Sequence, residues 1–157
     1  MNAQEVAARL KARHGIIVTA ESCTGGWVAQ ELTAIAGSSS WFDRGFVTYS
    51  NEAKQEMLGV RGETLAKHGA VSEQTAAEMA RGALERSRAT LSLAITGIAG
   101  PGGGTPAKPV GTVCFAWATR AGPERAETKH FPGDREAVRR QSVEYSLSRV
   151  LEILDGA

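Results

Sequence analysis

Ala20-Glu21-Ser22-Cys23-Thr24-Gly25-Gly26 is the stretch that decides the fold, because it joins a short β-branched apolar run, residues 16–19, to a helical pattern. The helical pattern is carried by apolar residues at Val28, Ala29, Leu32, Ile35 and Ala36. Ser22 to Gly26 are therefore expected at the carboxyl end of a strand and at the start of a helix. Unpaired backbone N–H groups and the positive end of the helix dipole gather at such a junction, which suits an anion or an oxyanion. A plainer role for Ser22 or Thr24 is to cap the helix.

Two other unusual stretches stand where strand patterns end. They are Phe46-Val47-Thr48-Tyr49-Ser50-Asn51-Glu52-Ala53-Lys54 and Thr96-Gly97-Ile98-Ala99-Gly100-Pro101-Gly102-Gly103-Gly104. Their position suggests that three segments, far apart in sequence, gather polar and glycine residues at one sheet edge.

The remaining pattern predicts alternating strands and helices in a single domain, residues 1–157. Strands are expected over residues 16–19, 41–49, 91–96, 110–118 and 124–131, and helices over 1–13, 28–36, 52–58, 72–84 and 134–154. The short link 120–123 favours an antiparallel pair of strands on either side of it. This order indicates an α/β fold, with helices on both sides of a mixed, mostly parallel sheet of about five strands.

Composition excludes several classes of protein. The net charge of +1 offers no basic field for a nucleic-acid backbone, so we expect no nucleic-acid partner. No apolar run is long enough to cross a bilayer, and the amphipathic N-terminus does not resemble a signal peptide. Cys23 and Cys114 form neither a disulfide framework nor a metal-ligand spacing, which fits a cytoplasmic protein.

A serine nucleophile needs a base, and the sequence offers a lysine more readily than a histidine. His14, His68 and His130 are scattered, and none stands at the end of a strand pattern. Lys54 begins a helix after a strand and can point back to the sheet edge, where burial would lower its pKa. A solvated surface lysine is the alternative.

The chain resembles the CinA C-terminal domain family, and more closely the stand-alone nicotinamide mononucleotide deamidases of bacteria. The resemblance rests on AESCTGG, VTYSNEAK, GAVS, TGIAGPGGG and KPVGTV, which occur in the family's order and spacing from about residue 18 to the last helix. It implies a three-layer α/β/α fold without a cofactor or metal. It also implies that Ser22 attacks the carboxamide of nicotinamide mononucleotide, with Lys54 as the base and Tyr49 as a polar neighbour that orients or relays.

Substrate-binding residues are expected around the same edge. They are Cys23, Thr24, Gly25, Gly26, Asn51, Thr96, Gly97, Gly100, Gly102 and Arg139. Backbone N–H groups from Cys23 to Gly26 could form an oxyanion hole, and the glycine-rich stretch 97–104 could form a nest for the nucleotide phosphate or simply be a flexible turn. Arg135 and Arg139 could add positive charge, or could be solvated behind Asp134 as a helix cap.

Alternatives to this hypothesis remain open. Cys23 is a rival nucleophile, although buried cysteines beside strands are usually inert. The domain could also be a non-catalytic nucleotide-binding module, or an amidase for another small amide. A homodimer is expected, and Trp41 and Phe42 are candidates for an exposed interface.

Overall fold

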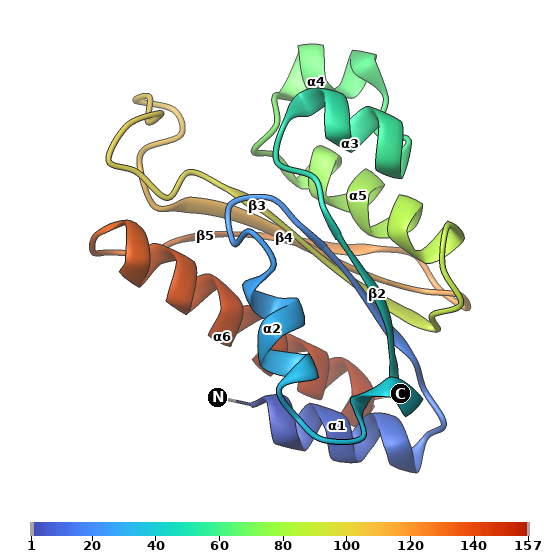
Figure 1. Cartoon of the computed structure of the whole chain (residues 1–157). Coiled ribbons are helices and arrows are strands. Elements are labelled where there is room, and N and C mark those ends of the chain that lie inside the picture. The colour runs from blue at the N-terminus through green and yellow to red at the C-terminus, as the bar shows by residue number, and fades with distance from the viewer. Residues whose placement is uncertain (1, 157) are drawn as a thin grey trace.

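A five-stranded sheet lies between two layers of helices in a computed structural model of the chain, which describes residues 2–156 (Figure 1). The strands are β1 (Ile17–Glu21), β2 (Phe42–Val47), β3 (Leu91–Gly97), β4 (Thr112–Thr119) and β5 (Arg125–His130). The helices are α1 (Ala3–Ala12), α2 (Trp27–Thr33), α3 (Asn51–Leu58), α4 (Gly62–His68), α5 (Glu73–Glu85) and α6 (Arg135–Gly156), with a 3-10 turn at Ser38–Ser40. The predicted α/β class and its three layers are confirmed. Met1 and Ala157, which the predicted domain includes, lie outside the described residues.

The strand order β2-β1-β3-β4-β5 brings three carboxyl ends together. β1 pairs in parallel with β2 on one side and with β3 on the other. β4 runs antiparallel to β3, and β5 antiparallel to β4, as the short link between them predicted. Because β1, β2 and β3 point the same way, the segments that follow them meet at one edge of the sheet.

Each face of the sheet has its own apolar core. Helices α1, α2 and α6 cover one face around Phe115 and Trp117, whereas α5 covers the other with α3 and α4 stacked beyond it (Figure 1). The helix expected over residues 72–84 is confirmed as α5, whose inner face carries the fully buried Ala76, Met79 and Ala80. The packing of these helices on both faces fixes the position of the sheet, and with it the edge at which β1, β2 and β3 end.

The structure differs from the sequence prediction at three places. α4 occupies residues expected to form a connection, and it starts without a capping side chain at Arg61. α2 ends at Thr33, so the expected continuation to Ala36 is wrong. The exposure expected at Trp41 is also wrong, because Trp41 is 1% exposed, and Phe42 is partly buried against the core.

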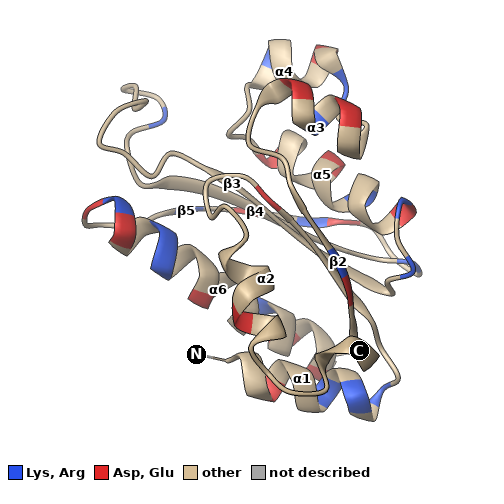
Figure 2. Ribbon diagram, in the orientation of Figure 1, with Lys and Arg blue, Asp and Glu red and all other residues tan. Residues whose placement is uncertain are grey.

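Charged residues of both signs are mixed over the molecule. Figure 2 shows Lys and Arg interspersed with Asp and Glu on helices of both layers. Within residues 2–156, no helix is both long and apolar enough to span a membrane.

Candidate active site

The ε-amine of Lys54 lies beside the hydroxyl of Ser22, although the residues are far apart in sequence. Lys54 Nζ is 3.0 Å from Ser22 Oγ and donates to the carbonyls of Thr48 at 2.9 Å and Tyr49 at 3.1 Å. Ser22 Oγ also lies 3.4 Å from the carbonyl of Tyr49. The pair is therefore held at the sheet edge where β1 and β2 end.

The local sequence explains how Lys54 reaches this position. Ser50 caps α3 by accepting a hydrogen bond from Ala53 N at 3.0 Å, as expected from the sequence. The first turn of α3 then directs Lys54 back toward the end of β2. At the far end of α3, Val60 N donates to the Lys54 carbonyl at 3.1 Å. Lys54 is thus fixed through both its main chain and its amine.

Burial shifts the pKa values of Lys54 and Cys23 in opposite directions. Lys54 is 1% exposed, and desolvation by burial lowers the pKa of its amine below the ordinary 10.5. Burial raises the pKa of the Cys23 thiol to about 12. The environment therefore favours a neutral amine on Lys54 and a protonated, unreactive thiol on Cys23.

A cavity of about 250 Å³ opens next to the pair. Eight of the predicted site residues line it: Ser22, Cys23, Tyr49, Lys54, Thr96, Gly97, Gly100 and Gly102. The segments following β1, β2 and β3 all contribute, together with Ala70 and Val71 ahead of α5 and Arg135 at the start of α6. Its size suits a small molecule and not a polymer.

The turn after Ser22 is organised by a residue that the sequence prediction did not include. Neither Ser22 nor Thr24 caps α2, whose N-cap is Gly26 with φ of +104° and no capping side chain. The buried carboxylate of Glu21 instead accepts from Val28 N at 2.9 Å and Ala29 N at 3.1 Å. The N–H groups in the first turn of α2 are therefore not free for a ligand.

Three N–H groups in this turn make no main-chain hydrogen bond within residues 2–156: those of Cys23, Thr24 and Gly26, whereas Gly25 N donates to the Ser22 carbonyl. The N–H groups of Cys23 and Thr24 follow directly after Ser22 in the chain. Two adjacent donors next to a serine hydroxyl have the chemistry of an oxyanion hole.

No side chain of the five remaining predicted site residues lines the cavity. Thr24, Gly25 and Gly26 belong to the turn that follows Cys23, and Asn51 is exposed at the start of α3. Arg139 points at the turn, where its guanidinium donates to the carbonyls of Cys23 at 3.0 Å and Thr24 at 3.3 Å.

Arg135, one helical turn earlier, is the arginine that reaches the cavity. It donates to the carbonyl of Gly100 at 2.7 Å and to the hydroxyl of Tyr49 at 3.1 Å. Asp134 caps α6 through Ala137 N at 2.9 Å, as the sequence suggested. The hydroxyl of Tyr49 therefore contacts Arg135, while the main-chain carbonyl of Tyr49 contacts Lys54.

Glycines allow the cavity walls to approach closely. A Cβ at Gly97 would lie 3.1 Å from the sulfur of Cys23 and 2.9 Å from Val113, so only glycine lets β3 pack against the serine turn. Gly100 has φ of +87°, and a Cβ there would meet Val110 at 2.5 Å. Thr96 at the end of β3 is linked to the segment before α5, because its hydroxyl donates to the Ala70 carbonyl at 2.8 Å.

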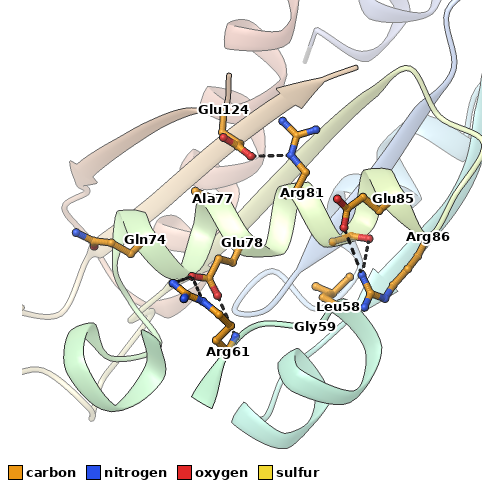
Figure 3. A pocket seen from close by; sticks show the side chains of 11 residues that line it. Leu58, Gly59, Arg61, Gln74, Ala77, Glu78, Arg81, Glu85, Arg86 and Glu124 are labelled. Carbon is orange, nitrogen blue, oxygen red and sulfur yellow. Dashed lines mark hydrogen bonds and ion pairs between the residues drawn. The ribbon is translucent and has the colours of Figure 1, made fainter. Parts of the chain in front are cut away.

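Larger hollows elsewhere lack this chemistry. Figure 3 shows one of about 490 Å³ over α5, where Arg81 pairs with Glu124 and Arg61 pairs with Glu78. The hydrogen bond from Arg81 lowers the pKa of Glu124, so these charges satisfy one another. Among the described residues, no group of three or more His, Cys, Asp or Glu side chains could hold a metal ion.

Comparison with known proteins gives consistent matches along the chain. The model of the CinA C-terminal domain matches residues 1–154. Nicotinamide-nucleotide amidohydrolase PncC from Escherichia coli K12 is 60% identical over 144 residues, covering 92% of this chain and 87% of that protein. A CinA-like protein from Chloroherpeton thalassium is 54% identical over 94% of this chain, but the match covers only 36% of that longer protein.

Solved structures agree with this relationship. A CinA superfamily protein from Klebsiella pneumoniae has a TM-score of 0.95 at 44% identity, covering 99% of this chain and 96% of that one. The competence/damage inducible protein CihA from Agrobacterium tumefaciens has a TM-score of 0.90 at 48% identity, covering 99% and 96% respectively.

Proposed function

This chain belongs to the CinA C-terminal domain family, and from that premise we propose that it hydrolyses nicotinamide mononucleotide to nicotinic acid mononucleotide and ammonia. The observation that carries the proposal is the buried contact of 3.0 Å between Lys54 Nζ and Ser22 Oγ. The 60% identity to PncC of Escherichia coli, named as a nicotinamide-nucleotide amidohydrolase, supports the choice of substrate.

The acylation step uses the neutral amine of Lys54. Ser22 Oγ attacks the carboxamide carbon while its proton passes to Lys54 Nζ. Negative charge then develops on the amide oxygen, which the N–H groups of Cys23 and Thr24 can stabilise, a donor of this kind contributing about 3 kcal/mol. Lys54 returns its proton to the departing nitrogen, so ammonia leaves and an ester forms on Ser22.

The deacylation step uses the same groups with water as the nucleophile. Lys54 removes a proton from water, whose oxygen attacks the ester carbon, and the proton then passes to Ser22 Oγ. Nicotinic acid mononucleotide leaves as a carboxylate once its acid proton has passed to solvent or to the released ammonia, and the free hydroxyl is restored. These two reaction steps need no redox partner, because the net reaction is hydrolysis of one C–N bond.

The phosphate of the nucleotide is assigned to the opposite wall of the cavity. Arg135 supplies the positive charge there, and the N–H groups of Gly102 and Gly103 have no acceptor within residues 2–156. A guanidinium with adjacent free N–H groups suits a phosphate. Tyr49 would then contribute its carbonyl to Lys54 and its ring, 61% exposed as a residue, to the mouth of the cavity.

Ammonia release from nicotinamide mononucleotide by the wild type, Ser22→Ala and Cys23→Ala tests the proposal, with nicotinamide riboside and nicotinamide as controls. Activity on the mononucleotide that Ser22→Ala abolishes and Cys23→Ala largely keeps would support it. Binding of the mononucleotide without any ammonia would favour a binding module instead. Release of ammonia from a different amide, and not from the mononucleotide, would support an amidase with another substrate.

A further inference from the structure

The carboxylate of Glu21 accepts three hydrogen bonds from the turn after Ser22 and from the start of α2. Glu21 ends β1 and is 1% exposed, and Ser22 is its neighbour in the chain. In addition to the two N–H groups of α2, its carboxylate accepts from Thr24 Oγ1 at 2.6 Å. No lysine or arginine among residues 2–156 forms an ion pair with it, so its direct partners are these three donors.

The turn is also held from its other side. Arg139 reaches it from α6, bonds the carbonyls of Cys23 and Thr24, and packs its guanidinium 5.3 Å from the Trp27 ring. Glu21 therefore binds the donors of the turn while Arg139 binds its acceptors. The short segment between β1 and α2 is fixed by opposite charges on two sides.

Glu21 also connects this turn to the base. Its main-chain carbonyl accepts from Thr48 N at 2.8 Å, and the carbonyl of Thr48 in turn accepts from Lys54 Nζ at 2.9 Å. The side chain of Glu21 thus fixes the turn that carries the nucleophile. Its main chain fixes the strand end that holds the base.

We propose that Glu21 is a positioning residue for the hydrolysis, because its carboxylate sets the turn that directs Ser22 Oγ toward Lys54 and the N–H groups of Cys23 and Thr24 toward the substrate oxygen. The inference rests on the proposed function. It also explains why the phosphate is assigned to the far wall: a carboxylate already occupies the positive end of α2 and repels a second anion.

Glu21→Gln tests the role at nearly constant volume. The new amide group is a donor, so it cannot accept from Val28 N or Ala29 N on that side. Misplacement of about 1 Å at a catalytic group can cost about a hundredfold, so we expect kcat to fall by about thirtyfold to three hundredfold with KM changed less than about threefold. The pH midpoint of activity should stay in place, because Lys54 keeps its surroundings.

Glu31→Gln is the matched control, since it lies in α2 and keeps an acceptor for Trp27 Nε1. Thr24→Val, which loses only the hydroxyl bond to Glu21, and Thr24→Ser, which keeps it, form a second pair in case Glu21→Gln does not fold. Circular dichroism and thermal melting give the folded fraction. Thr24→Val should lose kcat, and Thr24→Ser should keep most of it.

The labelling rate of Ser22 by a fluorophosphonate separates this inference from the proposed function. If the wild type fails to hydrolyse nicotinamide mononucleotide, the proposed function fails, yet slower labelling in folded Glu21→Gln would still support positioning. Unchanged kcat and labelling in the folded variant would overturn the inference. So would a loss of activity that only matches the loss of folded protein.

Discussion

Lys54 Nζ lies 3.0 Å from Ser22 Oγ, and its two other hydrogen bonds go to the main-chain carbonyls of Thr48 and Tyr49. A charged amine has three donors, which match these three oxygens. A neutral amine keeps two donors for the carbonyls, so its lone pair faces Ser22. The main chain therefore sets the direction of the proposed proton transfer, because among the described groups that contact Lys54 Nζ only the hydroxyl of Ser22 carries a proton to give.

Activity should rise with pH around a midpoint below 10.5, because burial lowers the pKa of Lys54 and only its neutral form accepts a proton. Lys54→Arg should reduce kcat/KM by roughly a thousandfold, since general base catalysis contributes about 10²–10⁴. Lys67→Arg, on the exposed side of α4, is the control. The profile of kcat/KM against pH checks this, and a midpoint at or above the ordinary lysine value would contradict it.

The free energy of unfolding should also depend on pH because of the lowered pKa of Lys54. Between the lowered pKa of folded Lys54 and 10.5, the unfolded chain binds a proton that the folded chain does not. The free energy of unfolding should therefore increase with pH across that window and be smallest below it. Urea unfolding at several pH values measures the slope for the wild type and Lys54→Met, and an identical slope in both would exclude a contribution from Lys54.

Gly97→Ala should disturb the serine turn. Its Cβ would lie 2.9 Å from Val113 and 3.1 Å from the sulfur of Cys23, and overpacking of this kind costs about 1–3 kcal/mol. Adding Cys23→Ala removes one of the clashing atoms and should restore part of the lost stability. Gly102→Ala, with no atom within 4 Å of its Cβ, is the stability control. Additive losses in the double variant would argue against contact between the two sites.

Arg135→Gln should separate binding of the phosphate from chemistry at the amide. Loss of a charged hydrogen bond costs about 1.5–3 kcal/mol, so KM for nicotinamide mononucleotide should rise about tenfold or more, with little change in kcat. Weak hydrolysis of nicotinamide riboside should be unaffected. Arg140→Gln, whose parent residue pairs with Glu136 on α6, is the control. An equal loss of activity on both substrates would contradict the placement of the phosphate beside Arg135.

Gly82→Ala should destabilise the fold strongly, although alanine favours helices. The new Cβ would lie 1.9 Å from the carbonyl oxygen of Leu58, where α5 crosses the end of α3. We expect a loss of about 3 kcal/mol or more, well above the helix-propensity gain of about 1 kcal/mol. Gly156→Ala, in open space at the end of α6, should be neutral or slightly stabilising in the same denaturation assay.

Much of the fold was readable from the sequence because it depends on local periodicity. The inner face of α5 and the cap at Ser50 follow from spacing and side-chain chemistry alone. α4 was not predicted because it is seven residues long, begins with glycine and lacks a capping side chain. Such a helix is held by packing against α5, which no local pattern reports.

Eight of the predicted site residues line the cavity, but the sequence did not give the orientation of their side chains. Arg135 and Arg139 share a helix face, and sequence spacing does not say which guanidinium reaches the cavity and which holds the turn. Glu21 was missed because capping rules look for an acceptor next to the helix, whereas this carboxylate stands five positions before Gly26. A strand-final acid ahead of a glycine-capped helix is the signal that could have found it.

The buried thiol of Cys23 separates this chemistry from the redox state of its surroundings. With its pKa raised to about 12, the sulfur stays protonated at neutral pH, and a protonated thiol is a poor target for peroxide or alkylating agents. The Ser22 side chain next to it is an alcohol, which such oxidants leave intact. Oxidants that inactivate thiolate enzymes should therefore spare the hydrolysis proposed for Ser22.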